Sequence, residues 1–240
     1  MREAVHYAAK VALEEGFFAG IIKNASFEVN IRTADSGCSA TQASQVALPL
    51  LLGQGTANGR IHSDTVDLAP VVAVSGCYCS AASMAFSQLA TPLEVVVVSG
   101  VSSNPTLSNK VLHPYFARVI PSDSSQGAGL ARLVSTFANQ APSNSWTEVV
   151  LMYLQDTYSE GIADAFAAAD AVANMTVVKE PLPLLSTRTV ELAVDLEYDK
   201  LVTIAERILT QNPMARVFVF PSEGDYYPGP IIRAFVEAGL

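Results

Sequence analysis

The chain has 240 residues and a formal net charge of −9, with 14 Lys and Arg residues against 23 Asp and Glu residues. This shortage of basic residues argues against nucleic acid as a partner, because phosphate backbones are bound by clustered Lys and Arg side chains. Half of the residues are hydrophobic, enough for one large domain or two modest ones with real cores. The longest apolar runs, such as Val95–Val98, fall far short of the ~20 residues that a membrane span needs.

Short β-branched runs alternate with helical stretches along the first half of the chain, a pattern typical of parallel sheets built from βαβ units. The continuous apolar runs at 70–74 and 94–98 predict strands that are covered on both faces. Gly53 is expected to end the second helix. The pattern predicts strands over 27–31, 70–74, 94–98 and 115–120, and helices over 1–15, 41–52, 79–90 and 122–139.

A stretch rich in Pro, Ser and Asn, at 141–145, predicts a crossing to a second unit. Asp195 precedes an apolar-periodic run and is expected to cap a helix that extends to about Thr210. The Pro-rich segment 179–187 is expected to be irregular. The remaining pattern predicts strands over 148–154, 175–178, 189–193 and 216–220, and helices over 160–172 and 230–238.

Two clusters of small hydroxyl residues follow neighbouring predicted strands. Ser75–Ser80 follow the strand that ends at Val74, and Ser99–Asn104 follow the strand that ends at Val98. In open parallel sheets, ligands bind beyond the carboxyl ends of the strands, where hydroxyls can hydrogen-bond a carboxylate or an ammonium group. The alternative is that these serines cap helices and turns. The pairing of the two loops favours a site for a small polar molecule.

Patterns that would indicate catalysis or metal binding do not occur in the sequence. There is no Gly-x-Ser-x-Gly turn, no phosphate loop and no dinucleotide fingerprint. Cys77 and Cys79 are separated by one residue, and no Cys or His pair follows at the spacing of a zinc site. We therefore expect a binding protein rather than an enzyme, with no cofactor and no metal.

Several motifs together resemble a known family, the type I periplasmic-binding-protein fold in its eukaryotic form. This receptor ligand-binding region forms the extracellular domains of class C G-protein-coupled receptors and of natriuretic-peptide receptor guanylyl cyclases. The likeness is to GABA-B-type and metabotropic glutamate receptors in particular. The motifs are ADSGCSATQAS at 34–44, GCYCSAAS at 76–83, SGVSSNPTLSNK at 99–110, HPYFARVIPSD at 113–123, QDTYSEGIADAF at 155–166 and, more weakly, ARVFVFPSEG at 215–224.

The resemblance implies an α/β fold of two lobes, each a mostly parallel sheet flanked by helices, with lobe 1 over 1–143 and lobe 2 over 144–240. It also implies which side chains hold an amino-acid-like ligand between the closing lobes. From lobe 1 these are Ser80, Ser99 and Ser103, with Ser102 as the alternative if the loop register slips by one. From lobe 2, Tyr158 would close over the ligand, and Asp156 or Glu223 could pair with an ammonium group unless they act as caps.

In many relatives a disulfide joins the acidic turn to the helix start that follows the GCYC motif. The resemblance therefore implies that Cys38 pairs with Cys79, or alternatively with Cys77, which leaves one cysteine unpaired. Such a disulfide requires an oxidising compartment.

We therefore expect the extracellular ligand-binding domain of a cell-surface receptor, which forms a homo- or heterodimer through lobe 1 and signals through lobe closure. The alternative is a soluble solute-binding protein that delivers amino acids or other small polar nutrients to an ABC-type transporter. Measured against the family pattern, the chain lacks the first strand of lobe 1 and the last part of both lobes. It is therefore expected to be a segment of a longer protein.

Overall fold

A computed structural model describes residues 31–53, 61–63, 69–140, 146–182, 190–221 and 228–239. The chain divides into two compact units. Unit 1 comprises Met1–Gly100 and His113–Ala117, and unit 2 comprises Val101–Leu112 and Arg118–Leu240. The predicted crossing at 141–145 and the predicted helix at 1–15 lie outside the described residues, as does all but the last residue of the strand predicted at 27–31. The predicted lobe boundary between 143 and 144 stays a prediction.

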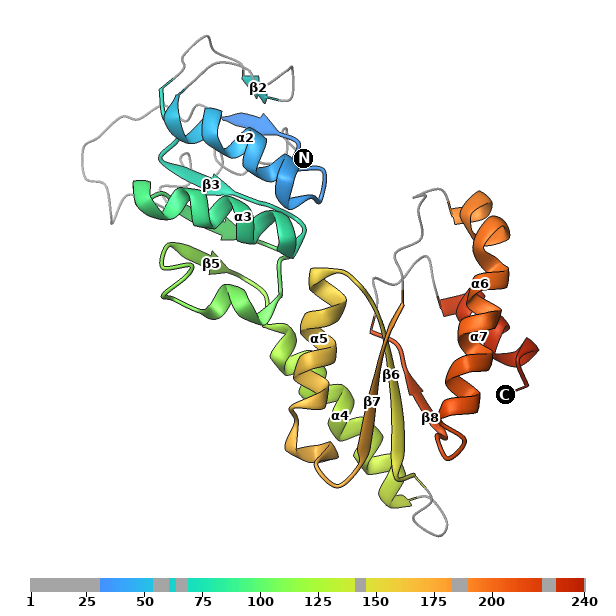
Figure 1. Cartoon of the computed structure of the whole chain (residues 1–240). Coiled ribbons are helices and arrows are strands. Elements are labelled where there is room, and N and C mark those ends of the chain that lie inside the picture. Colours follow the sequence, from blue (N-terminus) through green and yellow to red (C-terminus); the bar gives the residue numbers. More distant parts are fainter. Residues whose placement is uncertain are drawn as a thin grey trace, which may run out of the picture. The chain divides into compact units, whose positions relative to one another are not determined.

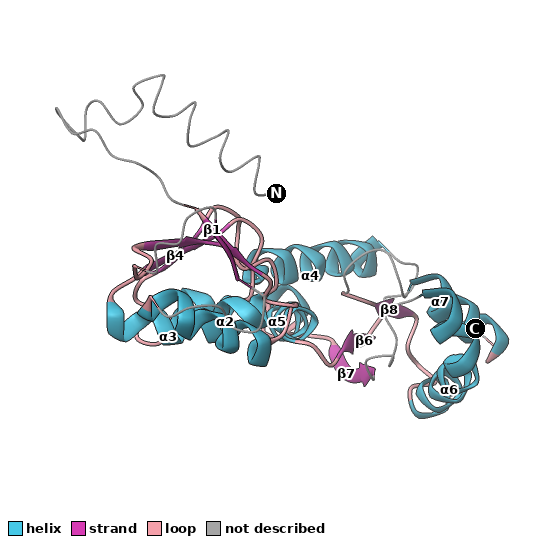
Figure 2. Cartoon of the chain, turned by 90° about the horizontal axis from the view of Figure 1, so that it is seen from above, coloured by secondary structure: helices cyan, strands magenta, loops and turns pink. Residues whose placement is uncertain are grey.

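Unit 1 is built on a three-stranded sheet of order β3-β4-β5, in which β3 runs parallel to β4. The helices α2 and α3 pack beside each other on one side of this sheet (Figures 1 and 2). A separate antiparallel pair joins β1 to β2. The elements are β1 (Arg32–Ala34), α2 (Ala40–Leu52), β2 (Ile61–Ser63), β3 (Ala73–Ser75), α3 (Ser80–Ala90), β4 (Val96–Ser99) and β5 (Phe116–Arg118).

Local signals explain why α2 begins and ends where it does. The Ser39 hydroxyl accepts a hydrogen bond from the Gln42 backbone N–H at 3.4 Å, which satisfies one of the unpaired donors of the first turn. At the other end, Gly53 adopts a left-handed conformation with φ 66°, which glycine tolerates without steric cost. The predicted helix over 41–52 and its end at Gly53 are confirmed.

The two faces of the sheet of unit 1 differ in exposure. Val97 in β4 is fully buried, whereas its neighbour Val96, on the opposite face, is 42% exposed. Ala73 and Ser75 of β3 are exposed on that same face. In the described part of the chain, α2 and α3 cover one face of the sheet. The helix predicted over 1–15 lies outside the described residues, so the covering of the second face stays a prediction.

Unit 2 is a second three-stranded sheet of order β7-β6-β8, and both strand pairs are parallel. The helices α4 and α5 lie on one face of this sheet, and α6 and α7 lie on the other (Figure 1). The elements are α4 (Asp123–Gln140), β6 (Glu148–Leu154), α5 (Thr157–Ala167), β7 (Thr176–Leu182), α6 (Val190–Gln211), β8 (Val217–Val219) and α7 (Pro228–Glu237), with short 3₁₀ helices at Pro105–Ser108 and Asp170–Val172.

The central strand β6 is buried on both faces, because successive side chains of a strand point in opposite directions. Val149 and Leu151 pack in a core with side chains of α4 and α5, including Ala131 and Phe166. The alternate residues Val150, Met152 and Leu154 pack in a second core with α6 and α7, including Leu201, Ile208 and Phe235. Burial on both sides accounts for the unbroken apolar run of this strand.

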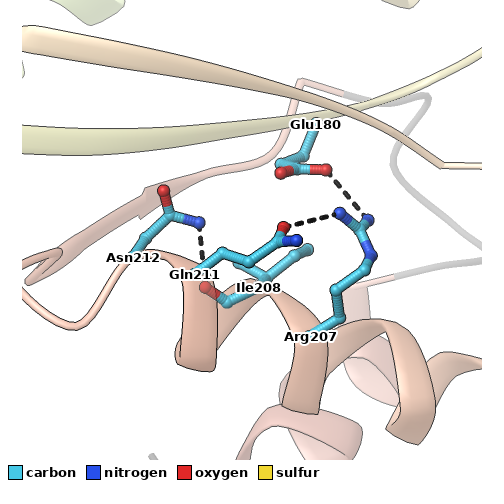
Figure 3. A network of polar contacts seen from close by, with 5 residues as sticks. All are labelled: Glu180, Arg207, Ile208, Gln211 and Asn212. Atoms are coloured by element: carbon cyan, nitrogen blue, oxygen red, sulfur yellow. Dashed lines mark hydrogen bonds and ion pairs between the residues drawn. The ribbon is translucent and has the colours of Figure 1, made fainter.

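A polar contact fastens α6 to β7 within unit 2 (Figure 3). Arg207 donates from one terminal nitrogen to Glu180 Oε2 at 2.9 Å and from the other to Gln211 Oε1 at 3.1 Å. Glu180 is almost completely buried in β7, and a buried carboxylate is tolerated only when it is paired. Beside this pair, Asn212 donates to the Ile208 carbonyl twice, from its Nδ2 at 2.8 Å and from its backbone N–H at 2.9 Å, near the end of the helix.

Two parts of unit 2 differ from the sequence prediction. Residues 190–193, predicted as a strand, form the first turn of α6, which is a single helix of 22 residues. The strand predicted over 175–178 extends to Leu182 and includes Pro181. This proline is accommodated because, among the described strands, β7 lies at the edge of the sheet and pairs with β6 alone.

Close packing of α4 against α5 depends on the absence of a side chain at Gly127. A Cβ atom at this position would lie 2.6 Å from both the Ala165 Cβ and the Phe166 backbone nitrogen. We expect Gly127→Ala to lower the free energy of unfolding by about 1–3 kcal/mol, the usual effect of overpacking, measured by urea denaturation. Gly129→Ala, in the same helix with open space around its Cβ, is the matched control and should raise stability by about 0.5–1 kcal/mol. Equal effects of the two substitutions would contradict this interpretation.

Candidate ligand-binding site

Unit 1 holds hydroxyl residues of both clusters, Ser80 from the first and Ser99 from the second, and both are buried. The Ser99 hydroxyl donates to the Cys77 carbonyl at 2.7 Å, and the Ser83 hydroxyl donates to the same carbonyl at 3.3 Å. The Gly76 N–H donates to the Val98 carbonyl at 2.9 Å and continues the pairing of β3 with β4. The serines therefore hold the loop before α3 in place at the end of the sheet.

A disulfide joins Cys38 to Cys79 at the start of α3, with the two Cα atoms 5.1 Å apart and a sequence separation of 41 residues. Of the two pairings considered from the sequence, this is the one present. Before it, the Asp35 carboxylate accepts a hydrogen bond from the Gly37 N–H at 2.8 Å, which forms the turn that presents Cys38. Cys77 is not part of a disulfide, and burial raises the pKa of its thiol against the opposing effect of a hydrogen bond with Ser36.

The later part of the second hydroxyl cluster, Ser102–Asn104, belongs to unit 2 and forms a buried loop. Ser102, Ser103 and Asn104 are each at most 5% exposed, and we call them the serine loop. Arg118 donates from one guanidinium nitrogen to the carbonyls of Ser103 and Asn104, both at 2.8 Å, and from another to the Ser108 hydroxyl. These contacts fix the backbone of the loop.

Asp123, at the start of α4, also contacts the serine loop. Its backbone N–H donates to the Ser103 carbonyl at 2.9 Å, and its carboxylate, which is fully buried, accepts a hydrogen bond from Gln126 Nε2 at 2.9 Å. Burial raises the pKa of the Asp123 carboxyl, and a hydrogen bond from the Ser103 side chain and the charge of Arg118 oppose this without cancelling it.

The Asp156 carboxylate caps α5. Its Oδ1 accepts hydrogen bonds from the backbone N–H groups of Tyr158 at 2.9 Å and Ser159 at 2.8 Å, and its Oδ2 accepts from the Ser159 hydroxyl at 3.0 Å. The sequence predicted that this helix begins at Glu160, but it begins at Thr157. The Asp156 cap explains the difference, because an aspartate at this position satisfies the free donors of the first turn. The cap also fixes the backbone of Tyr158 in the first turn.

The sequence-predicted site residues are thus divided between the two units. Ser80 and Ser99 lie in unit 1. Unit 2 contains Ser102, Ser103, Asp156 and Tyr158. The family resemblance had assigned Ser102 and Ser103 to lobe 1. Glu223 lies outside the described residues. Their roles toward a ligand stay predictions.

Three residues important to this arrangement were not singled out from the sequence: Asn104, Arg118 and Asp123. The last two lie within the HPYFARVIPSD motif, where charged residues interrupt an otherwise apolar strand and helix start. Charged residues in a stretch that is otherwise apolar need specific partners when they are buried. Their presence in this motif was the signal that could have identified Arg118 and Asp123.

Comparison with known proteins shows the family. Residues 5–236 match the family described as receptor family ligand binding region, and the chain belongs to this family. A probable metabotropic glutamate receptor, mgl-1, of Caenorhabditis elegans is 35% identical over 96 residues, which are 40% of this chain and 9% of that protein. Glutamate receptor 3.7 of Arabidopsis thaliana is 29% identical over 153 residues, which are 62% of this chain and 14% of that protein.

These findings confirm the expected class of protein, an α/β ligand-binding region of the type I periplasmic-binding-protein kind. The matched segments cover only a small part of the length of either relative. Across the ranges that the structure describes, no helix combines the length and apolar character needed to cross a membrane.

Loss of the disulfide should destabilise the chain substantially. In the chain-entropy treatment, a cross-link that closes a loop of 41 residues stabilises the folded state by about 4 kcal/mol. We expect the double substitution Cys38→Ala/Cys79→Ala to lower the free energy of unfolding in urea by roughly this amount. Cys77→Ala, which leaves the disulfide intact, is the control and should cost less than about 1 kcal/mol. A double variant as stable as the wild type would contradict the expectation.

The raised pKa of Asp123 predicts a pH dependence of stability. Because the folded state binds the proton more tightly than the unfolded chain, the free energy of unfolding falls as the pH rises from the ordinary Asp pKa through the raised one. Above that window the ionised carboxylate is destabilising. Asp123→Asn cannot ionise, so we expect it to be more stable than the wild type at neutral pH and to lose this advantage near pH ~4.

Urea denaturation at several pH values measures this difference, with Asp199→Asn on the exposed surface of α6 as the control that should change little at any pH. If Asp123→Asn were less stable than the wild type by the same amount at every pH, burial would not be the dominant effect on Asp123.

Proposed function

We propose that this chain is the extracellular ligand-binding domain of a membrane receptor. In this proposal it binds a small amino-acid-like molecule between two closing lobes, and closure is transmitted to the rest of the receptor. The observation that carries the proposal is the match of residues 5–236 to receptor ligand-binding regions. Two relatives from an animal and a plant are both named as glutamate receptors, which supports a ligand with a carboxylate and an ammonium group.

The chemistry of the candidate residues supports the same ligand class. Hydroxyl groups can donate to a carboxylate and accept from an ammonium group, and buried hydroxyls gather at Ser80 and Ser99 in unit 1 and at Ser102 and Ser103 in unit 2. Tyr158, in the first turn of α5, offers an aromatic face for the ligand's aliphatic part or cation. Binding without covalent chemistry is the role proposed for all of them.

A ligand shifts the closure equilibrium only if it binds the closed form more tightly than the open form. A ligand that contacted one lobe alone would bind without shifting the closure equilibrium. In this proposal Tyr158 therefore supplies the difference in affinity, while the serines supply contacts common to both forms. A dimer formed through lobe 1 at the cell surface, as the resemblance implies, is part of the same proposal.

The test is a thermal-shift screen of the protein at the full length that its gene encodes, against L-glutamate, γ-aminobutyrate, glycine, other amino acids and small carboxylates. At a ligand concentration about 100 times Kd, stabilisation of about 2.7 kcal/mol is expected, which corresponds to a rise of roughly 5–10 °C in the Tm of a cooperative unit of about 150–250 residues.

The shift should be lost in Ser103→Ala and in Tyr158→Ala, whereas Tyr158→Phe should retain it if the ring rather than the hydroxyl covers the ligand. Thr136→Ala, which removes an exposed hydroxyl of α4, is the control and should keep the full shift. The absence of any shift across the screen, or shifts unaffected by both alanine substitutions, would refute the proposal.

A further inference from the structure

The Asn104 side chain connects the serine loop to the first turn of α5, 53 residues away in sequence. Its Nδ2 donates to the Thr157 carbonyl at 2.5 Å, while its Oδ1 accepts from the Thr106 backbone N–H at 2.8 Å and so caps the short helix that follows. Only 5% of the residue is exposed. One amide therefore joins the loop that carries Ser103 to the residue that precedes Tyr158.

The surface of α5 is shaped to accept this side chain. A Cβ atom at Gly161, one turn after Thr157, would lie 2.6 Å from Asn104 Nδ2 and 3.0 Å from Pro105 Cδ. Any larger residue at position 161 would therefore push Asn104 away from the helix. The hydrogen bond and the close approach at Gly161 are two independent observations of the same contact.

The chemistry of this contact requires asparagine. The side chain must donate to a carbonyl and accept from an N–H group at the same time, in directions fixed by its planar amide. Asp offers only acceptors when ionised, and a Ser hydroxyl is too short to reach both groups. On its other side the loop is held by Arg118 and Asp123, which bond to the Ser103 carbonyl. A shift of Asn104 would therefore distort the hydrogen bonds of the neighbouring Ser103.

We propose that Asn104 is a positioning residue: it sets the register between the serine loop and Tyr158, and thereby the affinity for the amino-acid-like ligand. Asn104 does not itself touch the ligand. This inference rests on the proposed function, because Ser103 and Tyr158 matter only if they hold the ligand.

The decisive variant is Asn104→Asp, which keeps the shape of the side chain and the acceptor for Thr106 but places an oxygen against the Thr157 carbonyl. In the full-length protein, calorimetric titration with L-glutamate should show affinity at least about tenfold weaker, the effect of losing one well-made buried hydrogen bond. Asn109→Asp is the matched control in the same segment. Asn109 Oδ1 only accepts hydrogen bonds, from the N–H groups of Val111 and Leu112, so this change should leave affinity unaltered.

A general loss of stability must be distinguished from a loss of register. Ile208→Val removes a methyl group from the core on the opposite face of the β7-β6-β8 sheet and should lower Tm without changing the affinity for L-glutamate. If Ile208→Val weakened binding as much as Asn104→Asp, or if Asn104→Asp bound L-glutamate as tightly as the wild type, the inference would be overturned.

A double-mutant cycle tests the contact itself. Gly161→Ala should weaken L-glutamate binding on its own, because the new methyl group displaces Asn104. In the Asn104→Ala background the same substitution should cause a much smaller loss, since most of the crowding has been removed. Strictly additive losses would show that the two positions act separately and would contradict the inference.

Hydrogen exchange separates this inference from the proposed function. Asn104→Asp should accelerate amide exchange at the start of α5, including at Tyr158, whether or not L-glutamate binds. If the wild type does not bind L-glutamate but exchange is accelerated, the proposed ligand is wrong and the positioning role of Asn104 is retained. Unchanged exchange at α5 would refute the positioning role independently of any ligand.

Discussion

The guanidinium group of Arg118 organises the polar part of unit 2, because it bonds to two successive carbonyls of the serine loop, those of Ser103 and Asn104. Carbonyls buried in a loop lack the partners that helices and sheets supply and must find them elsewhere. Arg118 meets this requirement with a planar donor set on a single rigid group. With the carbonyls fixed, the Asn104 amide is directed at Thr157. The loop, the start of α4 and the start of α5 thus form one hydrogen-bonded assembly.

The apolar framework beneath this assembly is the strand β6. Its two faces belong to two separate cores, one with α4 and α5 and the other with α6 and α7. Asp156 lies two residues after this strand and caps α5. The position of Tyr158 therefore depends on that of β6, which cannot shift without disturbing both cores. A rigid framework with the candidate contacts at its end is what precise ligand positioning requires.

The elements with strong local signals were predictable from the sequence. The helix α2 has a serine cap and a terminal glycine, and β6 has an apolar run of the right length, and both were predicted closely. The failures occurred where local patterns conflict with tertiary context. The β-branched pair Thr189 and Val190 favoured a strand, but residues 190–193 form the first turn of a long helix. The candidate serines could be named from their place after strands, yet the partners of Asn104 and Arg118 depend on contacts between distant parts of the chain, which periodicity does not report. The choice of Cys79 over Cys77 was likewise decided by the fold.

Pro181 has a consequence for the solubility of the protein. The Leu182 carbonyl accepts a hydrogen bond from the backbone N–H of Gln155, which follows β6. The polar backbone groups of Leu182 therefore face β6. Those of Pro181, one residue earlier in a parallel strand, face away from β6. A proline there has no N–H group to offer. An additional strand from another molecule would find a missing donor along β7, and natural sheets use such interruptions to avoid edge-to-edge aggregation. The residue that interrupts the sequence pattern of this strand therefore also protects the side of β7 that no other described strand pairs with.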